Sequence, residues 1–336
     1  MTIVLTCNRK WYQYINTLIY SINENNSSKI YLIIEDDKLP YGVAENVKII
    51  NINDLKEYIT KDSPNYNTHY TKMTFVRCYL SKILKEDKII YLDADTIVNK
   101  SLLDLWNTDI ENYALAGVKE YGEWFDYIGV PNDKYINVGV LLMNLKYIRE
   151  NKLDDKIIKL LNERLFAFPD QDTINIVCEN KIKYINPIYN SQILTLITSN
   201  AVVFHYIRKQ KGWLRDSFRS EYWFRYRDKM LKEKLKGGYK MVRAEVIERF
   251  NFARFNELKN IVRKNANTQE GLLEVGDTFD CSKEIADYLL GENGLKRAFI
   301  EVIEVIPEEK AEIKEEPKEE KPVKKVAKKT TKKAKK

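Results

Sequence analysis

Two aspartates that follow a strongly apolar run have the clearest capacity for chemistry in this chain. Residues 89–92 read Ile-Ile-Tyr-Leu, the composition of a strand buried on both faces, and Asp93, Ala94 and Asp95 follow at once. In an extended chain, residues two apart point to the same side, so both carboxylates can aim at one point. Two unpaired acids there would repel each other and lose hydration, and a divalent cation such as Mg²⁺ or Mn²⁺ removes both costs. The alternative is a turn or a helix cap, where Asp is also common.

Two further segments carry polar groups suited to a ligand. Asn137 and Gly139 interrupt an apolar strand, where a glycine often marks the close approach of a ligand or another backbone. The alternative is a bulge with a hydrogen-bonded asparagine. Asp170 and Gln171 follow a proline at the start of an apolar helix. This pair suits sugar hydroxyl groups, although acids at a helix start also act as ordinary caps.

A third segment combines an imidazole with a basic loop. His205 ends an apolar run, and Arg208, Lys209 and Lys211 follow it. Imidazole is an acceptable manganese ligand, and a basic loop can neutralise a diphosphate.

Strands that alternate with helices are expected to position these residues. This order predicts an α/β fold with a parallel sheet, whose ligands bind beyond the carboxyl ends of the strands. The expected strands are 3–6, 30–34, 47–50, 89–92, 114–118, 136–143 and 201–204, and the expected helices are 11–22, 71–84, 146–165 and a shorter one after residue 169.

Composition indicates a soluble globular chain of roughly two domains. The 336 residues are 44% hydrophobic and 31% charged, no apolar run approaches the length of a membrane span, and the start does not resemble a signal peptide. The four cysteines show no paired spacing, so we expect a reducing, cytoplasmic location without disulfides or zinc. Residues 307–336 hold 12 Lys and 7 Glu, which leaves only +2 of the +7 charge on the rest. This balance does not indicate specific nucleic-acid binding.

Taken together, the motifs resemble the glycosyltransferase family that contains glycogenin and the bacterial lipopolysaccharide galactosyl- and glucosyltransferases. The resemblance runs from the N-terminus to about Trp213 and rests on YLDADTIV, NVG, DQD and HYIRKQKGW in this order. It implies a GT-A fold, Rossmann-like with a mostly parallel central sheet and flanking helices. It also implies a UDP-sugar donor, Mn²⁺ (with Mg²⁺ as the alternative) and transfer of the sugar with retention of anomeric configuration.

The resemblance assigns a role to each motif residue. Asp93, Asp95 and His205 would be the metal ligands, Asp170 would hold the sugar, and Gln171 would face the reacting centre. The implied donor-binding residues are Thr6 and Asn8 at the uracil, Arg77, Asp93 near the ribose, Ala94, Asn137 beside the sugar, Gly139, and Lys211 at the diphosphate.

Some positions depart from the family pattern. Asn8 stands where many members have Asp, Arg208 replaces a Gly whose backbone approaches the phosphate, and Gly212 replaces Pro. The interval from Asp172 to His205 is short for the family, and acceptor-binding structure often lies there. The sequence therefore leaves open whether the acceptor is a saccharide, a glycolipid or a protein. It also leaves open an enzyme with reduced transferase activity or one that hydrolyses the donor.

Residues 1–236 are expected to form the transferase domain, ending in a basic, aromatic helix over 216–236 that packs back on it or contacts a membrane surface. Gly237-Gly238 is expected to be a hinge, and the pattern of residues 239–306 predicts a small α+β accessory domain. Its expected strands are 240–248, 275–279 and 299–306, and its expected helix is 282–290. This unit resembles accessory domains of bacteriophage proteins and suits docking to another protein. The Lys/Glu-rich tail over 307–336 is expected to be disordered.

Two other function classes fit part of the pattern. A metal-dependent phosphohydrolase or nucleotidyltransferase also uses paired Asp, but it leaves the NVG, DQD and His-to-Lys segments unexplained. A non-catalytic assembly or nucleic-acid-binding protein would use the basic tail and the C-terminal unit.

Overall fold

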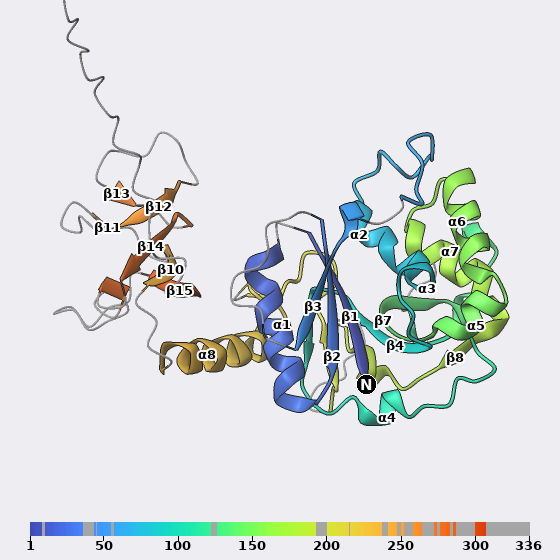
Figure 1. Ribbon diagram of the computed structural model, residues 1–336, viewed down its shortest axis with the longest axis horizontal. Helices are drawn as coiled ribbons and strands as arrows, with labels where there is room; N and C mark the ends of the chain where they lie inside the picture. Colours follow the sequence, from blue (N-terminus) through green and yellow to red (C-terminus); the bar gives the residue numbers. More distant parts are fainter. Residues whose placement is uncertain are drawn as a thin grey trace, which may run out of the picture.

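The computed structural model describes residues 1–8, 11–35, 44, 46–54, 57–121, 126–192, 200–214, 216–236, 241–246, 250–251, 258–263, 272–273, 276–282, 285–286 and 300–306. Its centre is a 7-stranded sheet in the order β3-β2-β1-β4-β7-β6-β8 (Figure 1). The strands are β1 (Thr2–Cys7), β2 (Lys29–Ile34), β3 (Val47–Asn51), β4 (Lys88–Leu92), β6 (Leu115–Lys119), β7 (Ile136–Asn144) and β8 (Ile182–Tyr184).

Neighbouring strands of this sheet run parallel except where β7 pairs with β4 and β6. The expected mostly parallel sheet is therefore confirmed, with one reversed strand. Leu5 of β1 pairs with Leu92 of β4, so the two strands end side by side. Val140 of β7 pairs with the same Leu92, so the first residues of β7 run past the end of β4. All three strands thus present residues at the edge where open α/β sheets bind ligands.

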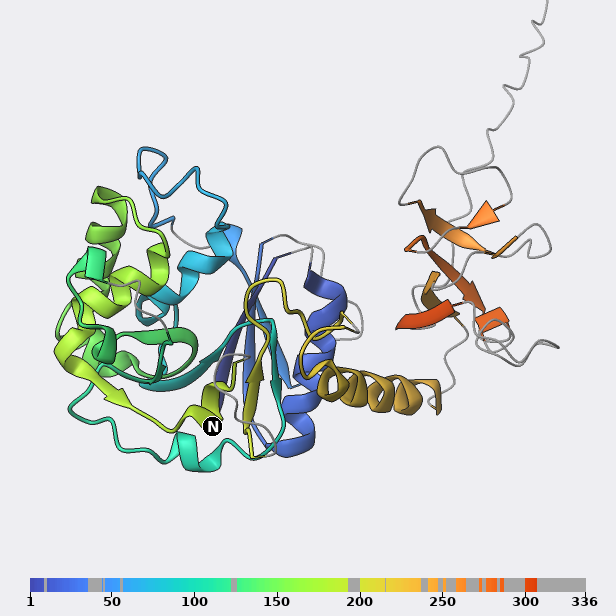
Figure 2. The same ribbon diagram turned by 180° about the vertical axis from the view of Figure 1, so that it is seen from behind.

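Helices cover both faces of the sheet, as alternate apolar side chains require (Figures 1 and 2). Leu5 faces the core under α1 (Tyr12–Asn25), and Val4 faces the other core. The second core lies under α5 (Leu145–Glu150), α6 (Leu153–Glu163) and α7 (Pro169–Cys178). All side chains of β4 from residue 89 to 92 are 0% exposed, which confirms a strand buried on both faces. Each such Ile or Leu contributes about 1.5–3 kcal/mol relative to an exposed one.

Two of the predicted helices are interrupted. The segment 71–84 forms α2 (Lys72–Phe75), the 3₁₀ helix η3 (Val76–Tyr79) and α3 (Leu80–Ile83). Its β-branched and aromatic residues favour a continuous helix poorly. The segment 146–165 splits into α5 and α6 because Lys152 adopts a left-handed φ of 51°.

A short antiparallel ribbon lies beside the main sheet. It pairs β5 (Thr96–Val98) with β9 (Val203–His205), and a single turn of helix, α4 (Leu103–Trp106), follows β5. The helix α8 (Ser220–Lys236) packs its Trp223 and Tyr226 against the ribbon residues Ile97 and Phe204. The expected return of this helix onto the first domain is therefore found. None of the helices in the described part of the chain is long and apolar enough to cross a membrane.

The C-terminal segment forms small antiparallel sheets. One has the order β12-β14-β10-β15, and the other pairs β11 with β13. Their strands are β10 (Met241–Val246), β11 (Phe250–Asn251), β12 (Lys259–Val262), β13 (Leu272–Leu273), β14 (Thr278–Ser282) and β15 (Ile300–Ile306). The three predicted strands correspond to β10, β14 and β15. The Gly237-Gly238 hinge, most of the helix at 282–290 and the tail 307–336 lie outside the described residues.

Candidate functional site

The carboxylates of Asp93 and Asp95 lie in the turn that joins β4 to β5. Thr96 closes this turn, donating its backbone N–H (3.2 Å) and its hydroxyl (2.7 Å) to the carbonyl oxygen of Asp93. The expectation that extended backbone aims both carboxylates is therefore wrong, and the turn named as the alternative is what forms. The carboxylates still converge, because the turn folds the chain back between two strands.

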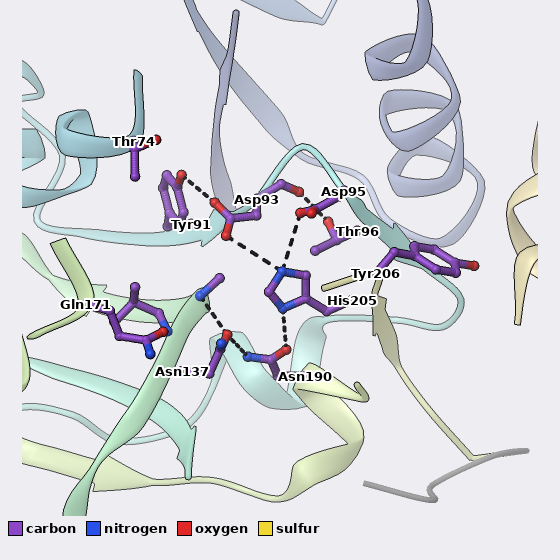
Figure 3. Close-up of polar contacts among 12 residues, drawn as sticks. Thr74, Tyr91, Asp93, Asp95, Thr96, Asn137, Gln171, Asn190, His205 and Tyr206 are labelled. Atoms are coloured by element: carbon purple, nitrogen blue, oxygen red, sulfur yellow. Dashed lines mark hydrogen bonds and ion pairs between the residues drawn. The ribbon is translucent and has the colours of Figure 1, made fainter. Parts of the chain in front are cut away.

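His205 reaches these carboxylates through the pairing of β5 with β9. The register places His205 opposite Thr96, the residue directly after Asp95. Its Nε2 lies 3.4 Å from Asp95 Oδ1 and 3.7 Å from Asp93 Oδ2 (Figure 3). One ligand atom from each of these three residues lies within 4.8 Å of the others. A single cation can therefore reach all three.

Gly139 leaves room for the His205 ring. A Cβ at this position would lie 2.1 Å from His205 Cε1 and 2.8 Å from Asp93 Oδ2. Real Cβ atoms essentially never show contacts this short, so no larger side chain fits unless the ring moves. A ligand or another backbone was expected to approach this glycine, but the closest group is a side chain, the His205 imidazole.

Arg77, on η3, binds two acids at once. Its guanidinium lies 2.5 Å from Asp93 Oδ1 and 3.1 Å from Asp170 Oδ2, and it donates to the carbonyl oxygen of Val138 at 2.9 Å. Burial would lower the pKa of Arg77, but Asp93 and the other neighbouring groups raise it above its ordinary value. Arg77 therefore stays charged and connects the ends of β4, β7 and α7.

The start of α7 contributes Asp170 and Gln171. Asp170 is 5% exposed, and burial raises the pKa of its carboxyl group from 3.8 to about 6 although Arg77 opposes this change. Gln171 accepts the backbone N–H of Val138 with Oε1 at 3.1 Å. This hydrogen bond holds the Gln171 amide beside β7.

Lys211, on the loop after β9, contacts Asp95. Its Nζ lies 2.5 Å from Asp95 Oδ2, donates to the carbonyl oxygen of Tyr206 at 3.0 Å, and lies 5.1 Å from the ring centroid of Trp11. Burial would raise the pKa of Asp95, but His205 and Lys211 lower it below its ordinary value. Lys211 thus places a positive charge at one of the predicted metal ligands.

These side chains line one cleft of about 650 Å³, a volume typical of small-molecule sites. Every residue that the motifs predicted for the site lies on its wall: Thr6, Asn8, Arg77, Asp93, Ala94, Asp95, Asn137, Gly139, Asp170, Gln171, His205 and Lys211. The structure brings all of them together, which is what their predicted roles require. The roles themselves stay predictions.

Sequence reasoning missed other residues of the site. Tyr91 was taken as part of an apolar strand, but its hydroxyl donates to Asp93 Oδ1 and pairs with Thr6 Oγ1, each at 2.9 Å. A tyrosine within a buried aliphatic strand is a usable signal, because its hydroxyl needs a partner. Asn190, 2.9 Å from His205 Nδ1, has no comparable signal in its spacing. The other lining residues that were missed include Trp11, His69, Tyr70, Glu120, Tyr121 and Phe168.

Arg208 has a φ of 58°. It stands where the family pattern has glycine, and glycine is the residue that adopts this left-handed conformation without strain. The backbone at Arg208 therefore keeps the conformation that glycine favours, although the residue is not glycine.

Comparisons with known proteins agree with the geometry. The model of glycosyl transferase family 8 matches residues 2–217. A provisionally named glycosyltransferase of Haemophilus influenzae is 30% identical over 244 residues, which are 63% of this chain and 73% of that protein. Glycosyltransferase GlyA of Streptococcus pneumoniae is 28% identical over 244 residues, which are 66% of this chain and 34% of GlyA. The chain thus spans about a third of GlyA.

Solved structures share the fold. The galactosyltransferase LgtC, in complex with donor and acceptor sugar analogs, matches with a TM-score of 0.52 and 21% identity, over 67% of this chain and 95% of LgtC. Glycosyltransferase GlyE of S. pneumoniae matches with a TM-score of 0.52 and 23% identity, over 70% of this chain and 63% of GlyE. These matches confirm the predicted GT-A fold. Because the family model covers more than half of the chain, including the whole cleft, this protein belongs to glycosyl transferase family 8 and is a glycosyltransferase.

Proposed function

We propose that this glycosyltransferase moves a hexose, glucose or galactose, from a UDP-sugar to an acceptor with retention of configuration and with dependence on Mn²⁺. The observation that carries the proposal is the convergence of Asp93, Asp95 and His205 within the cleft. Two carboxylates and one imidazole suit Mn²⁺, and Mg²⁺ is the alternative.

The charges around these ligands suit a nucleoside diphosphate leaving group. A divalent cation bound by Asp93, Asp95 and His205 supplies Lewis-acid stabilisation of the charge that develops on UDP. The Lys211 ammonium adds a fixed positive charge at the same place. Lys211 contacts Asp95 Oδ2, whereas Asp95 Oδ1 faces His205, so the ammonium lies directly beside the proposed cation position.

The remaining wall residues suit the rest of the donor. We assign Thr6 and Asn8 to the uracil and Asn137 with Asp170 to the sugar hydroxyls, and in support all four line the cleft. The Gln171 amide is a poor nucleophile, and the Asp170 carboxyl group is paired with Arg77. We therefore propose front-face transfer: the departing phosphate oxygen takes the acceptor proton, and the acceptor oxygen bonds to the anomeric carbon on the face that UDP leaves. The acceptor is a saccharide, a glycolipid or a protein.

The test is UDP release from UDP-glucose, UDP-galactose and UDP-N-acetyl sugars, with Mn²⁺ or with a chelator. Asp95→Asn should lower Mn²⁺-dependent release at least about 100-fold, because it removes an anionic ligand. Asp155→Asn is the matched control, since its carboxylate is exposed on α6 and pairs with Lys82. Unchanged turnover in Asp95→Asn would refute the metal assignment.

Two product measurements complete the test. Release of phosphate or pyrophosphate in place of UDP would favour the phosphohydrolase or nucleotidyltransferase alternative. NMR of the first sugar anomer released from an α-linked donor should show the α form, and the β form would refute retention.

A further inference from the structure

We infer that Asn190 is a positioning residue that keeps the proton of the neutral His205 ring on Nδ1 and so prepares Nε2 to bind the cation. The inference rests on the metal site of the proposed function, but it concerns hydrogen bonds within the chain. Asn190 is not among the residues that line the cleft, and it acts through His205.

A backbone N–H sets the direction of the hydrogen bonds that lead to His205. The Gly139 N–H donates to Asn137 Oδ1 at 3.0 Å, so this atom must be an acceptor, the amide oxygen. The same oxygen accepts from Asn190 Nδ2 at 2.8 Å (Figure 3). Asn190 therefore turns its own amide oxygen toward His205, where it lies 2.9 Å from Nδ1. Because an amide oxygen only accepts, Nδ1 must carry the proton.

The other end of this chain of hydrogen bonds fixes the same direction. Asn137 donates its Nδ2 to Glu120 Oε2 at 2.7 Å, and a carboxylate oxygen only accepts when ionised. Exchanging the oxygen and nitrogen of the Asn137 amide would place two acceptors together at Glu120 and two donors together at Gly139. The orientation of both asparagine amides is thus determined at two independent points.

Asn190 is also held firmly relative to His205. Its side chain is 0% exposed, and it ends the 3₁₀ helix η7 (Pro187–Asn190). The next residue, Ser191, donates its N–H to the carbonyl oxygen of Val203 and accepts the N–H of His205, each at 2.9 Å. Asn190 and His205 therefore lie on directly hydrogen-bonded backbone segments, and the Asn190 amide is shielded from solvent.

A proton on Nδ1 leaves the lone pair of the ring on Nε2. This is the atom that lies 3.4 Å from Asp95 Oδ1 and 3.7 Å from Asp93 Oδ2. Partners that orient a metal-binding histidine through its second nitrogen typically contribute about 10- to 100-fold in metal affinity. The same range is expected for Asn190.

The tautomer can be read directly by ¹⁵N NMR of imidazole-labelled protein. The full chain contains two histidines, so the spectrum has two rings, and His69→Gln assigns them. His205 should show a protonated Nδ1, because the atom that faces it is the Asn190 amide oxygen. A wild-type ring whose only proton is on Nε2 would overturn the inference, and this readout needs neither a cation nor a donor. If the wild-type protein shows no UDP-sugar turnover but its His205 ring carries the proton on Nδ1, the proposed function is refuted and this inference stands.

The variant Asn190→Ala tests the consequence. It should lose the preference for Nδ1–H and raise the Mn²⁺ dissociation constant about 10- to 100-fold, measured by calorimetry. Asn65→Ala is the matched control, because Asn65 is also 0% exposed but bonds to the carbonyls of Leu161 and Arg164. Its Mn²⁺ affinity should not change. An Asn190→Ala protein with wild-type Mn²⁺ affinity would refute the positioning role, and if this variant does not fold, the wild-type tautomer decides.

Discussion

Replacing Gly139 with alanine tests whether the site depends on the closeness of β7 to the His205 ring. The added methyl group would lie 2.1 Å from His205 Cε1, and ordinary contact begins at 3.4 Å, so the imidazole has to move by about 1.3 Å. The ring is 6% exposed and is bonded to Asn190 at 2.9 Å, so it cannot move this far and keep its partners. Functional groups tolerate displacements of only about 0.5 Å, and a 1 Å displacement can cost about 100-fold in rate.

We therefore expect Gly139→Ala to weaken Mn²⁺ binding at least about 10-fold and to lower UDP-sugar turnover about 100-fold. Overpacking should also lower the free energy of unfolding by about 1–3 kcal/mol. Calorimetric titration with Mn²⁺ and urea unfolding measure the two effects separately.

Gly117→Ala provides a matched control on the neighbouring strand β6. Its Cβ would lie 2.5 Å from Ile136 Cδ1, so it should also destabilise the fold, but Gly117 does not line the cleft. We expect it to lower the free energy of unfolding while the Mn²⁺ affinity stays at the wild-type value. A Gly139→Ala protein that binds Mn²⁺ as tightly as the wild type would refute the reasoning.

Three further changes give distinct readouts. The stability of wild-type protein should fall by about 3 kcal/mol more than that of Asp170→Asn as pH rises from about 3 to 7 in urea unfolding, since burial raises the pKa of Asp170 from 3.8 to about 6 and the unfolded chain ionises first; an equal pH dependence of the two proteins would contradict this. Lys211→Met should tighten Mn²⁺ binding to the protein alone, because it removes a positive charge beside Asp95, and weaken binding of UDP with Mn²⁺; calorimetry that shows both affinities falling would contradict this electrostatic role. Tyr91→Phe should lower the free energy of unfolding by about 1–2 kcal/mol and lower turnover less than 10-fold. It removes a hydroxyl that orients Asp93 but leaves Asp93 itself in place. A larger loss of turnover would assign that hydroxyl a direct role.

Asp93, Asp95 and His205 could be predicted because each stands beside a strong local pattern, whereas the family resemblance alone indicated Thr6, Asn8, Arg77 and Ala94. The buried character of β4 follows from four consecutive apolar residues, and Asp93 and Asp95 come directly after them. His205 likewise ends an apolar run. The burial of a short strand and the ligand chemistry of a side chain each depend on a few consecutive residues. Both can therefore be predicted from a short stretch of the sequence. The order of these motifs was also enough to indicate the family.

Long-range contacts decided how these residues meet. Asp95 and His205 are 110 positions apart, and only the pairing of β5 with β9 sets Thr96 opposite His205. The carboxylates converge because a turn folds the chain. The periodicity of an extended strand had instead predicted that residues two apart would point to the same side. The bonds of Asn190 to Asn137 and His205 also join distant segments. Such register and side-chain orientation depend on packing between segments far apart in the chain, so residue spacing along the sequence could not determine them.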